Sequence, residues 1–537
     1  MIKVKNPNQL DIFDPWAFLT PKRRQMLDSG WPGLFREVIL PSIPVNKVSK
    51  YFNANFGRPS KELYAMLGAL ILQQTFDLTD EETVQQYAFN IQWHYSLNIS
   101  EESDTAKYIS LKTLWNNRNI ISQNNLEKDI FQAGTDKLSQ VFKVNTDKQR
   151  IDSVHIKSNM RRLGRIGIFT ESIHKFLKNL KRGQNEQFDA INKKIVDKYL
   201  TKEALGCFSM VKPSESKKKL SEVSKDLFDL VQQFKGHPEV TSMYSYQLLG
   251  RVLQDHCHLT DDKDNPVELK NSKEIPSNSL QNPSDPDATY SGHKGQGYQV
   301  QVMETFCDDE KQKEQSVNLI THIEVEPAHE SDAKAIVPAI ESVEKRDLKP
   351  KELMADSLYG SDDNCKDADN KHGVELVAPT MGCVEKDKLS LSDFQFSPKG
   401  EIVACPQGHA PAKVKKRKRA SIGFSATSCQ NCPQLSNCPV KKGKKFYYLR
   451  FTDKEMRIAK RRLHEQSAEF KDRYRWRAGV EATMSEYDRR TGVKHLRVRG
   501  LKAVRYCATL KALGVNIFRA AAFRAAKMMP KEEICWA

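Results

Sequence analysis

The 537-residue sequence has no apolar run long enough to cross a bilayer. The longest run, Met66–Leu72, is far shorter than the roughly 20 apolar residues that a membrane-spanning helix needs. Residues 1–13 also lack the apolar segment of a secretory signal peptide. We therefore expect a cytoplasmic protein without a membrane span. Apolar residues still make up 39% of the chain and aromatic residues 9%, which is enough for packed cores and excludes a wholly disordered polymer.

Cysteine is too sparse for a disulfide framework, since seven of the 11 cysteines are scattered singly. The other four fall within 34 residues, which favours a reducing compartment and one metal site. Zinc takes four tetrahedral thiolate or imidazole ligands. The set that would complete such a site is Cys405, Cys429, Cys432 and Cys438, with His409 as a substitute for Cys405. Unliganded buried thiols are the alternative interpretation.

Acidic residues are scarce in the last quarter of the chain. Residues 401–537 hold 32 lysines and arginines against 11 aspartates and glutamates, whereas residues 1–400 hold 53 against 57. A solvated basic surface is one interpretation, and a polyanion-binding face is the other. The uneven distribution favours the second, because solubility alone does not require basic residues to gather in one region.

Two runs of lysine and arginine lie near the clustered cysteines, at residues 413–419 and 441–445. A loop held by zinc and carrying these runs would contact the DNA backbone, which contributes affinity but little sequence reading. The contacts predicted in the first run are Lys415, Lys416, Arg417, Lys418 and Arg419.

Helical periodicity predicts an all-α N-terminal domain at residues 1–145. Its clearest helical patterns cover residues 61–74, 80–89 and 110–117. A second stretch, highly charged and again helical, is expected as an insert at residues 157–280.

The periodicity changes to two, or to short buried runs, in five segments: 151–156, 297–306, 318–325, 352–356 and 374–378. Helices are expected at 331–343, between the last two strands, and at 453–491. Without its inserts, the order βββαβαβ-α fits an α/β fold with a mixed five-stranded sheet of the ribonuclease-H-like type, although periodicity alone also allows another α/β sheet. The catalytic core would occupy residues 146–400. A zinc-ribbon-like insert would follow at 401–450, and the catalytic helix with the C-terminal helices at 451–537.

Three acidic residues occupy informative positions along this order. Asp152 lies within the first strand, where a charge is costly unless it binds something. Asp356 ends the fourth strand, at the end where open α/β sheets place their sites. Glu481 shares one face of the expected long helix with Tyr474 and Arg477. Converging carboxylates repel one another and need cations, and two Mg²⁺ ions about 3.5–4 Å apart are the usual solution in nucleases and polymerases.

In these residues the chain resembles the bacterial insertion-sequence transposases that have a DDE catalytic domain and begin with an InsH-type helical domain. The resemblance covers nearly the whole chain. The matching segments are Leu63–Asn98, Ile151–Ser153, Ser284–Ala288, Lys294–Val300, Glu304–Thr305, Ala355–Gly360 and the helix with Tyr474, Arg477 and Glu481. The resemblance implies that Asp152, Asp356 and Glu481 are catalytic ligands of two Mg²⁺ or Mn²⁺ ions. The basic residue expected seven positions after the glutamate is displaced, because Asp488 stands there and Arg489 follows it.

The resemblance also implies what the protein acts on. The substrate would be double-stranded DNA, cut at the terminal inverted repeats of an insertion sequence, and the freed 3′-hydroxyl would attack target DNA. Joining two ends implies at least a homodimer in the DNA complex, and DNA as partner implies a place at the nucleoid. Beside the active site, the residues expected to contact DNA are Arg473, Trp476 and Arg477.

Four residues have two interpretations each. Asp285 and Asp287 stand just before a strand of the same sheet, as rival metal ligands or as caps of a proline-containing turn. Lys294 could reach a phosphate or be a solvated loop lysine. Trp476 could stack on a flipped base or pack its helix against the sheet.

Two other functions stay open. One is a nuclease of the same fold that does not transfer strands, which the residues cannot distinguish because both enzymes use the same metal site. The other is an inactive, zinc-containing DNA-binding protein derived from a transposase, against which the complete acidic triad argues.

Overall fold

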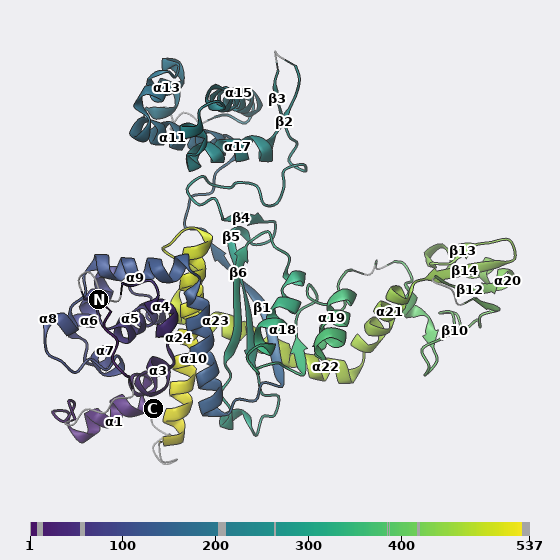
Figure 1. The fold of residues 1–537 in the computed structure, drawn as a ribbon. Helices are drawn as coiled ribbons and strands as arrows, with labels where there is room; N and C mark the ends of the chain where they lie inside the picture. Colours follow the sequence, from purple (N-terminus) through teal and green to yellow (C-terminus); the bar gives the residue numbers. More distant parts are fainter. Residues whose placement is uncertain are drawn as a thin grey trace.

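The protein is built around one mixed β-sheet, from which a helical insert and a small β-rich arm project in different directions (Figure 1). The computed structural model describes residues 2–7, 14–53, 59–201, 211–262, 265–383, 385, 387–415 and 419–528. In the described part of the chain, no helix is both long enough and apolar enough to cross a membrane.

The central strand of the sheet is β1 (Lys148–Lys157). On one side β5 (Gly295–Thr305) runs antiparallel to β1, and β6 (Ile320–Pro327) runs antiparallel to β5. On the other side β7 (Glu352–Met354) and β8 (Glu375–Val377) follow in parallel. All five expected strands are therefore present. The sheet differs from the expectation by a sixth, short strand, β4 (Thr289–Ser291), which pairs with the start of β5.

Helices cover both faces of this sheet. Since successive residues of a strand point to opposite faces, Ile151 packs on one face against α18 (Ile336–Glu344) and α19 (Asp362–His372). Val154 packs on the other face, in the core that includes α10 (Leu126–Phe142) and α24 (Leu501–Met528). Asp152 lies on this second face. The mixed α/β architecture is confirmed, whereas the ribonuclease-H-like assignment stays a prediction.

The N-terminal region is helical, as predicted. The three expected helices are α5 (Leu63–Thr75), α6 (Asp80–Phe89) and α9 (Leu111–Gln123). A reciprocal capping box between Thr79 and Glu82 fixes the start of α6. These helices do not form a core of their own, because α5, α24 and the second face of the sheet share one apolar cluster. The long C-terminal helix thus ties the first part of the chain to the sheet (Figure 1).

The helical insert has a separate core. Its main helices are α11 (Arg165–Gly183), α15 (Ser216–Phe234) and α17 (Tyr244–His256), which bury one another's apolar faces. Figure 1 shows the insert standing beyond the end of the sheet, above β4 and β5.

The arm contains a four-stranded antiparallel sheet in the order β11-β12-β14-β13. Its strands are β11 (Lys413–Lys415), β12 (Ala420–Ser425), β13 (Lys441–Lys442) and β14 (Phe446–Phe451). A small core with Phe394, Phe424 and Leu449 lies under one face. In Figure 1 the arm is at the opposite end of the molecule from the N-terminal helices.

The single helix expected at residues 453–491 is wrong, because the segment breaks into four pieces. They are α21 (Asp453–Glu465), α22 (Ala468–Tyr474), the 3₁₀ turn η6 (Arg475–Ala478) and α23 (Gly479–Thr491). The first break has a local cause, since the Ser467 hydroxyl accepts a hydrogen bond from the Phe470 N–H and caps a new helix. At the second break, the Trp476 carbonyl accepts a hydrogen bond from Arg150 of β1, 2.7 Å away.

Candidate active site

The first predicted ligand, Asp152, pairs with Arg477. Asp152 comes from β1 and Arg477 from the 3₁₀ turn η6, and the Arg477 Nη2 lies 2.7 Å from the Asp152 Oδ2. Both side chains are largely covered, with 16% and 17% of their surface exposed. A short, charge-assisted contact of this kind is stronger than a hydrogen bond between neutral groups.

The other two predicted ligands approach the same guanidinium. Asp356 follows β7, and its Oδ2 lies 4.0 Å from the Arg477 Nη2. Glu481, in the first turn of α23, places its Oε1 3.3 Å from the Arg477 Nη1. The turn after β7 is fixed because the Asp356 Oδ1 accepts a hydrogen bond from the Leu358 N–H. Carboxylates from three distant parts of the chain therefore converge on one cation.

Burial and charge act in opposite directions on the Asp152 carboxyl. Burial is the largest influence and raises its pKa above the usual range. Arg477 and the Ser153 N–H oppose this effect, whereas the negative charge of Asp356 adds to it. Burial also raises the pKa of the Tyr474 phenol, and the carboxylates of Asp356 and Asp152 reinforce that shift. The site is an acidic cluster whose repulsion Arg477 relieves.

The donor chemistry of this cluster fits Mg²⁺ or Mn²⁺, which prefer carboxylate oxygens. Within the described residues, however, no three histidine, cysteine, aspartate or glutamate side chains form a group that could hold a metal ion as they stand. In the carboxylate cluster, the Arg477 guanidinium lies among the three side chains, and the Glu481 side chain is 72% exposed.

A buried ionic network positions the turn that carries Arg477. Glu304 of β5 is fully buried, and its carboxylate binds Arg150 at 2.8 Å and Arg519 of α24 at 2.8 Å. The Glu304 Oε2 also accepts a hydrogen bond from Thr483 of α23, at 2.6 Å. Since Arg150 also donates to the Trp476 carbonyl, the network joins β1, β5, α23 and α24. Sequence reasoning noted Glu304 without giving it a role, although a glutamate inside an apolar strand was a signal of a buried partner.

Lys294 lies beside the acidic cluster, whereas its expected contact with a phosphate stays a prediction. It is in the tight turn between β4 and β5, and its Nζ donates to the Ser153 Oγ at 2.7 Å. The same Nζ lies 3.7 Å from Asp332, and the charge of Lys294 lowers the pKa of Asp152. Lys294 thus adds a second positive charge near Asp152.

Asp285 and Asp287 act as caps in this structure. Asp285 is fully buried and accepts hydrogen bonds from the Ser158 hydroxyl, the Tyr298 hydroxyl and the Gly500 N–H. The Asp287 Oδ2 accepts from the Leu501 N–H at 2.9 Å. Both carboxylates therefore cap the start of α24, more than 200 positions away in the sequence, rather than the local backbone of their own turn as the capping alternative had it.

Two residues expected to contact DNA have protein partners. Arg473 binds Glu352 at 2.8 Å and Glu375 at 2.5 Å, both on the parallel side of the sheet. Trp476 packs against the apolar cluster around Phe306, which is the packing role considered for it. Their assignment to DNA stays a prediction.

The four clustered cysteines gather around one cavity in the arm, which is lined by Cys405, Cys429, Cys432, Cys438 and His409, among others. Burial is the largest cause of the raised pKa of the Cys429 and Cys438 thiols, and the neighbouring thiols add to it. In the adjoining basic run, Lys415 and Arg419 are exposed, whereas Lys416, Arg417 and Lys418 lie outside the described residues.

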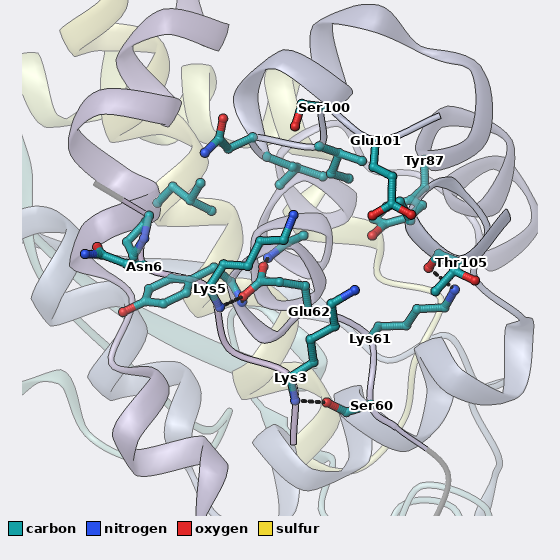
Figure 2. Close-up of a pocket in the computed structure, with 18 residues that line it drawn as sticks. Lys3, Lys5, Asn6, Ser60, Lys61, Glu62, Tyr87, Ser100, Glu101 and Thr105 are labelled. Atoms are coloured by element: carbon teal, nitrogen blue, oxygen red, sulfur yellow. Dashed lines mark hydrogen bonds between the residues drawn. The ribbon is translucent and has the colours of Figure 1, made fainter. Parts of the chain in front are cut away.

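Another cavity lies among the N-terminal helices, and none of Asp152, Asp356 and Glu481 lines it (Figure 2). There the Lys3 N–H donates to the Ser60 Oγ at 2.9 Å, and the Lys5 N–H to the Glu62 Oε1 at 3.1 Å. The Glu62 carboxylate also caps α5, so these contacts fasten the N-terminal segment to the start of that helix.

Two family models match the chain. One, described as "Transposase DDE domain", matches residues 404–521, which run from the arm through Glu481 into α24. The other, described as "Transposase domain (DUF772)", matches residues 32–119 in the N-terminal helices. Asp152 and Asp356 lie between the two matched regions. No curated protein and no solved structure matches the chain.

Proposed function

Because the chain belongs to the insertion-sequence DDE transposases, we propose that it cuts DNA at the terminal inverted repeats of its element and joins the freed strand to target DNA. The observation that carries the proposal is the convergence of Asp152, Asp356 and Glu481 on one guanidinium. Ordinary capping or surface pairing does not require carboxylates from a central strand, a strand end and a late helix to meet.

The strand order supports a ribonuclease-H-like core for this reaction. Three antiparallel strands, β6, β5 and β1, continue into the parallel pair β7 and β8. Asp152 on the central strand and Asp356 after its parallel neighbour then lie next to each other. The order of the strands alone therefore explains why two of the three carboxylates, those of Asp152 and Asp356, are neighbours.

Divalent metal ions would be held by Asp152, Asp356 and Glu481. When bound, Mg²⁺ or Mn²⁺ would activate the attacking oxygen and stabilise the leaving oxygen of an in-line phosphoryl displacement. The protein's own contribution is to hold three carboxylates at one place despite their repulsion, which Arg477 and Lys294 reduce. A guanidinium also binds two phosphate oxygens in a planar fork, so Arg477 is suited to the scissile phosphate once it leaves the carboxylates.

The partner is double-stranded DNA, and two ends must be held together for strand transfer. We therefore propose that the chain acts as at least a homodimer in the DNA complex. The basic residues of the arm would contribute to DNA affinity. We further propose that Cys405, Cys429, Cys432 and Cys438, or His409 in place of Cys405, hold a structural Zn²⁺, for which their shared cavity supplies soft ligands.

The function is tested with DNA that carries the flanking repeats, Mg²⁺ or Mn²⁺, and three forms of the full chain. The wild type is expected to cut at the repeat boundary, and Glu481→Gln to lose cutting while keeping repeat binding. Glu469→Gln, an exposed glutamate of α22, is the matched control and should cut normally. Equal cutting by wild type and Glu481→Gln would remove Glu481 from the site.

A nuclease without strand transfer is the second candidate, favoured by the same carboxylate cluster. Supplying pre-cut ends with a free 3′-hydroxyl and a supercoiled target separates the two. Joined products support the transposase, whereas cleavage without any joining supports the nuclease. Repeat binding without cutting by the wild type would instead support an inactive DNA-binding protein.

A further inference from the structure

The sheet of the arm has one face that is not covered by its own core. Ile422, Phe424 and Leu449 point to the covered face, where they pack on Phe394 and Phe451. Because side chains alternate along a strand, their sequence neighbours point to the opposite face, here called the outer face. It carries Lys413, Lys415, Ser421, Gly423, Ser425, Lys441, Phe446, Tyr448 and Arg450.

The register orders these side chains into rows across the strands. Lys413 pairs with Gly423, Gly423 with Tyr448, and Tyr448 with Lys441, so one row crosses all four strands. A lysine stands at each edge of this row. The usual spacing between neighbouring strands places the two edge strands about 14 Å from each other. Between them lie a glycine and an aromatic ring. The outer face therefore has basic edges and an aromatic centre.

The aromatic centre depends on glycine. A Cβ on Gly443 would lie 2.5 Å from the Tyr448 Cε2, and a Cβ on Gly423 would lie 3.3 Å from the Tyr448 Cε1. Phe446 contacts Tyr448 edge to face with ring centroids 6.2 Å apart, and the Arg450 guanidinium lies 5.8 Å from the Tyr448 ring centre. Tyr448 is half-buried and absent from the core of the arm. The ring is held in place by its neighbours on the outer face.

The charge of the arm identifies the kind of partner. Residues 402–452 contain 11 lysines and arginines and not one aspartate or glutamate. A surface with this excess of positive charge attracts a polyanion. Aromatic rings among the cations can also stack on nucleic-acid bases. Bases are available for such stacking in a single strand, whereas duplex DNA keeps them inside its helix.

We propose that the outer face binds single-stranded DNA, with phosphates on the edge lysines and unpaired bases on Tyr448 and Phe446. This inference rests on the proposed function only in taking DNA as the partner. It adds a binding surface distinct from the carboxylates, suited to a strand that is unpaired while an end is cut or joined.

The test measures binding of the full chain to a short fluorescein-labelled single strand and to the matching duplex, by fluorescence anisotropy. Tyr448→Leu is expected to weaken single-strand binding at least about fivefold, the loss of one stacked base, and to change duplex binding little. Tyr448→Phe keeps the ring and should bind as the wild type does. Equal single-strand binding by the wild type and Tyr448→Leu would overturn the proposal.

Two adjacent lysines of β13 give a matched charge control. Lys441 lies in the row with Tyr448, whereas Lys442 pairs with the buried Tyr447 and belongs to the other face. Lys441→Ala should weaken single-strand binding and lower the salt dependence by roughly 0.7 in slope, as expected for one lost phosphate contact. Lys442→Ala should have a much smaller effect, and equal effects of the two would contradict a specific face.

The inference and the proposed function can fail separately. Glu481→Gln removes no residue of the arm and should leave single-strand binding intact. A wild type that binds single strands through Tyr448 but never cuts would refute the transposase proposal alone. A wild type that cuts at the repeats while Tyr448→Leu binds single strands normally would refute the outer-face proposal alone.

Discussion

The Arg477 guanidinium and the Asp152 carboxylate, 325 positions apart in the chain, meet with 2.7 Å between Nη2 and Oδ2. Asp356 and Glu481 approach the same guanidinium. Arg477 therefore supplies a positive charge beside all three carboxylates. A metal ion and Arg477 would compete for the same carboxylates.

This competition predicts the behaviour of Arg477→Met without and with Mg²⁺. Without Mg²⁺, the variant leaves Lys294 as the remaining counter-charge beside the repelling carboxylates, and we expect the Tm to fall by about 2–4 °C. Addition of Mg²⁺ should raise the Tm of the variant more than that of the wild type. Arg475→Met removes an exposed arginine paired with Asp472 and should change little, and a Mg²⁺ response equal to the wild type would contradict the competition.

The buried network predicts a large effect of Glu304→Gln. The change leaves Arg150 and Arg519 without their shared carboxylate in a buried place, which costs about 3–5 kcal/mol of stability. We expect a strongly lowered Tm in thermal denaturation, together with loss of cutting. Glu324→Gln breaks a partly exposed pair with Lys128 and serves as the control, with an expected cost below about 1 kcal/mol.

A substitution at Gly479 should disturb the Glu304 network sterically. A Cβ there would lie 2.1 Å from the Arg150 Nη1, so Gly479→Ala must displace the guanidinium that holds the Trp476 carbonyl. Stability and cutting should both fall. Gly250→Ala, within α17 and with open space around its Cβ, should instead stabilise the protein by about 0.5–1 kcal/mol. A neutral result for Gly479→Ala in thermal denaturation would show that the network tolerates the added methyl group.

Glu127 predicts a pH dependence of stability. Its side chain is fully buried, neither carboxylate oxygen has a hydrogen-bond partner among the described residues, and burial raises its pKa to about 7. The protonated form is therefore favoured in the folded protein, so the stability linked to this group is present below pH 4.5 and is lost as the pH rises through 7.

Glu127→Gln removes this titration, so its Tm should match the wild type near pH 4.5. At pH 8.5 the variant should be more stable than the wild type, by up to about 3 kcal/mol in the free energy of unfolding, and its Tm should be higher. Thermal scans of both proteins at the two pH values provide the measurement. Glu341→Gln, at an exposed position of α18, should leave the pH dependence unchanged. The same difference between Glu127→Gln and wild type at both pH values would refute the assignment.

The cysteine cluster predicts a metal-dependent arm. If Cys405, Cys429, Cys432 and Cys438 hold zinc, the purified protein contains about one Zn²⁺ per chain, and Cys432→Ser loses it. Cys383→Ser changes an exposed cysteine outside the cluster and should retain the metal. Elemental analysis measures the zinc, and a metal-free wild type with an intact arm would reject the site.

The amino-acid sequence by itself determined where the strands of the central sheet and several helices lie, and it predicted the acidic triad. Alternation or short buried runs predicted the five strands, and helical spacing predicted α5, α6 and α18, because each pattern extends over a few residues and needs no distant partner. Asp152, Asp356 and Glu481 were identified from strand position and family resemblance.

Only the tertiary structure decided how these residues are used. The break between α22 and α23, the caps made by Asp285 and Asp287, and the network around Glu304 all depend on partners far away in the sequence. No local pattern encodes a contact between residues 150, 304 and 519. Burial makes each of these charges costly alone, so the fold is stable only where it brings them together.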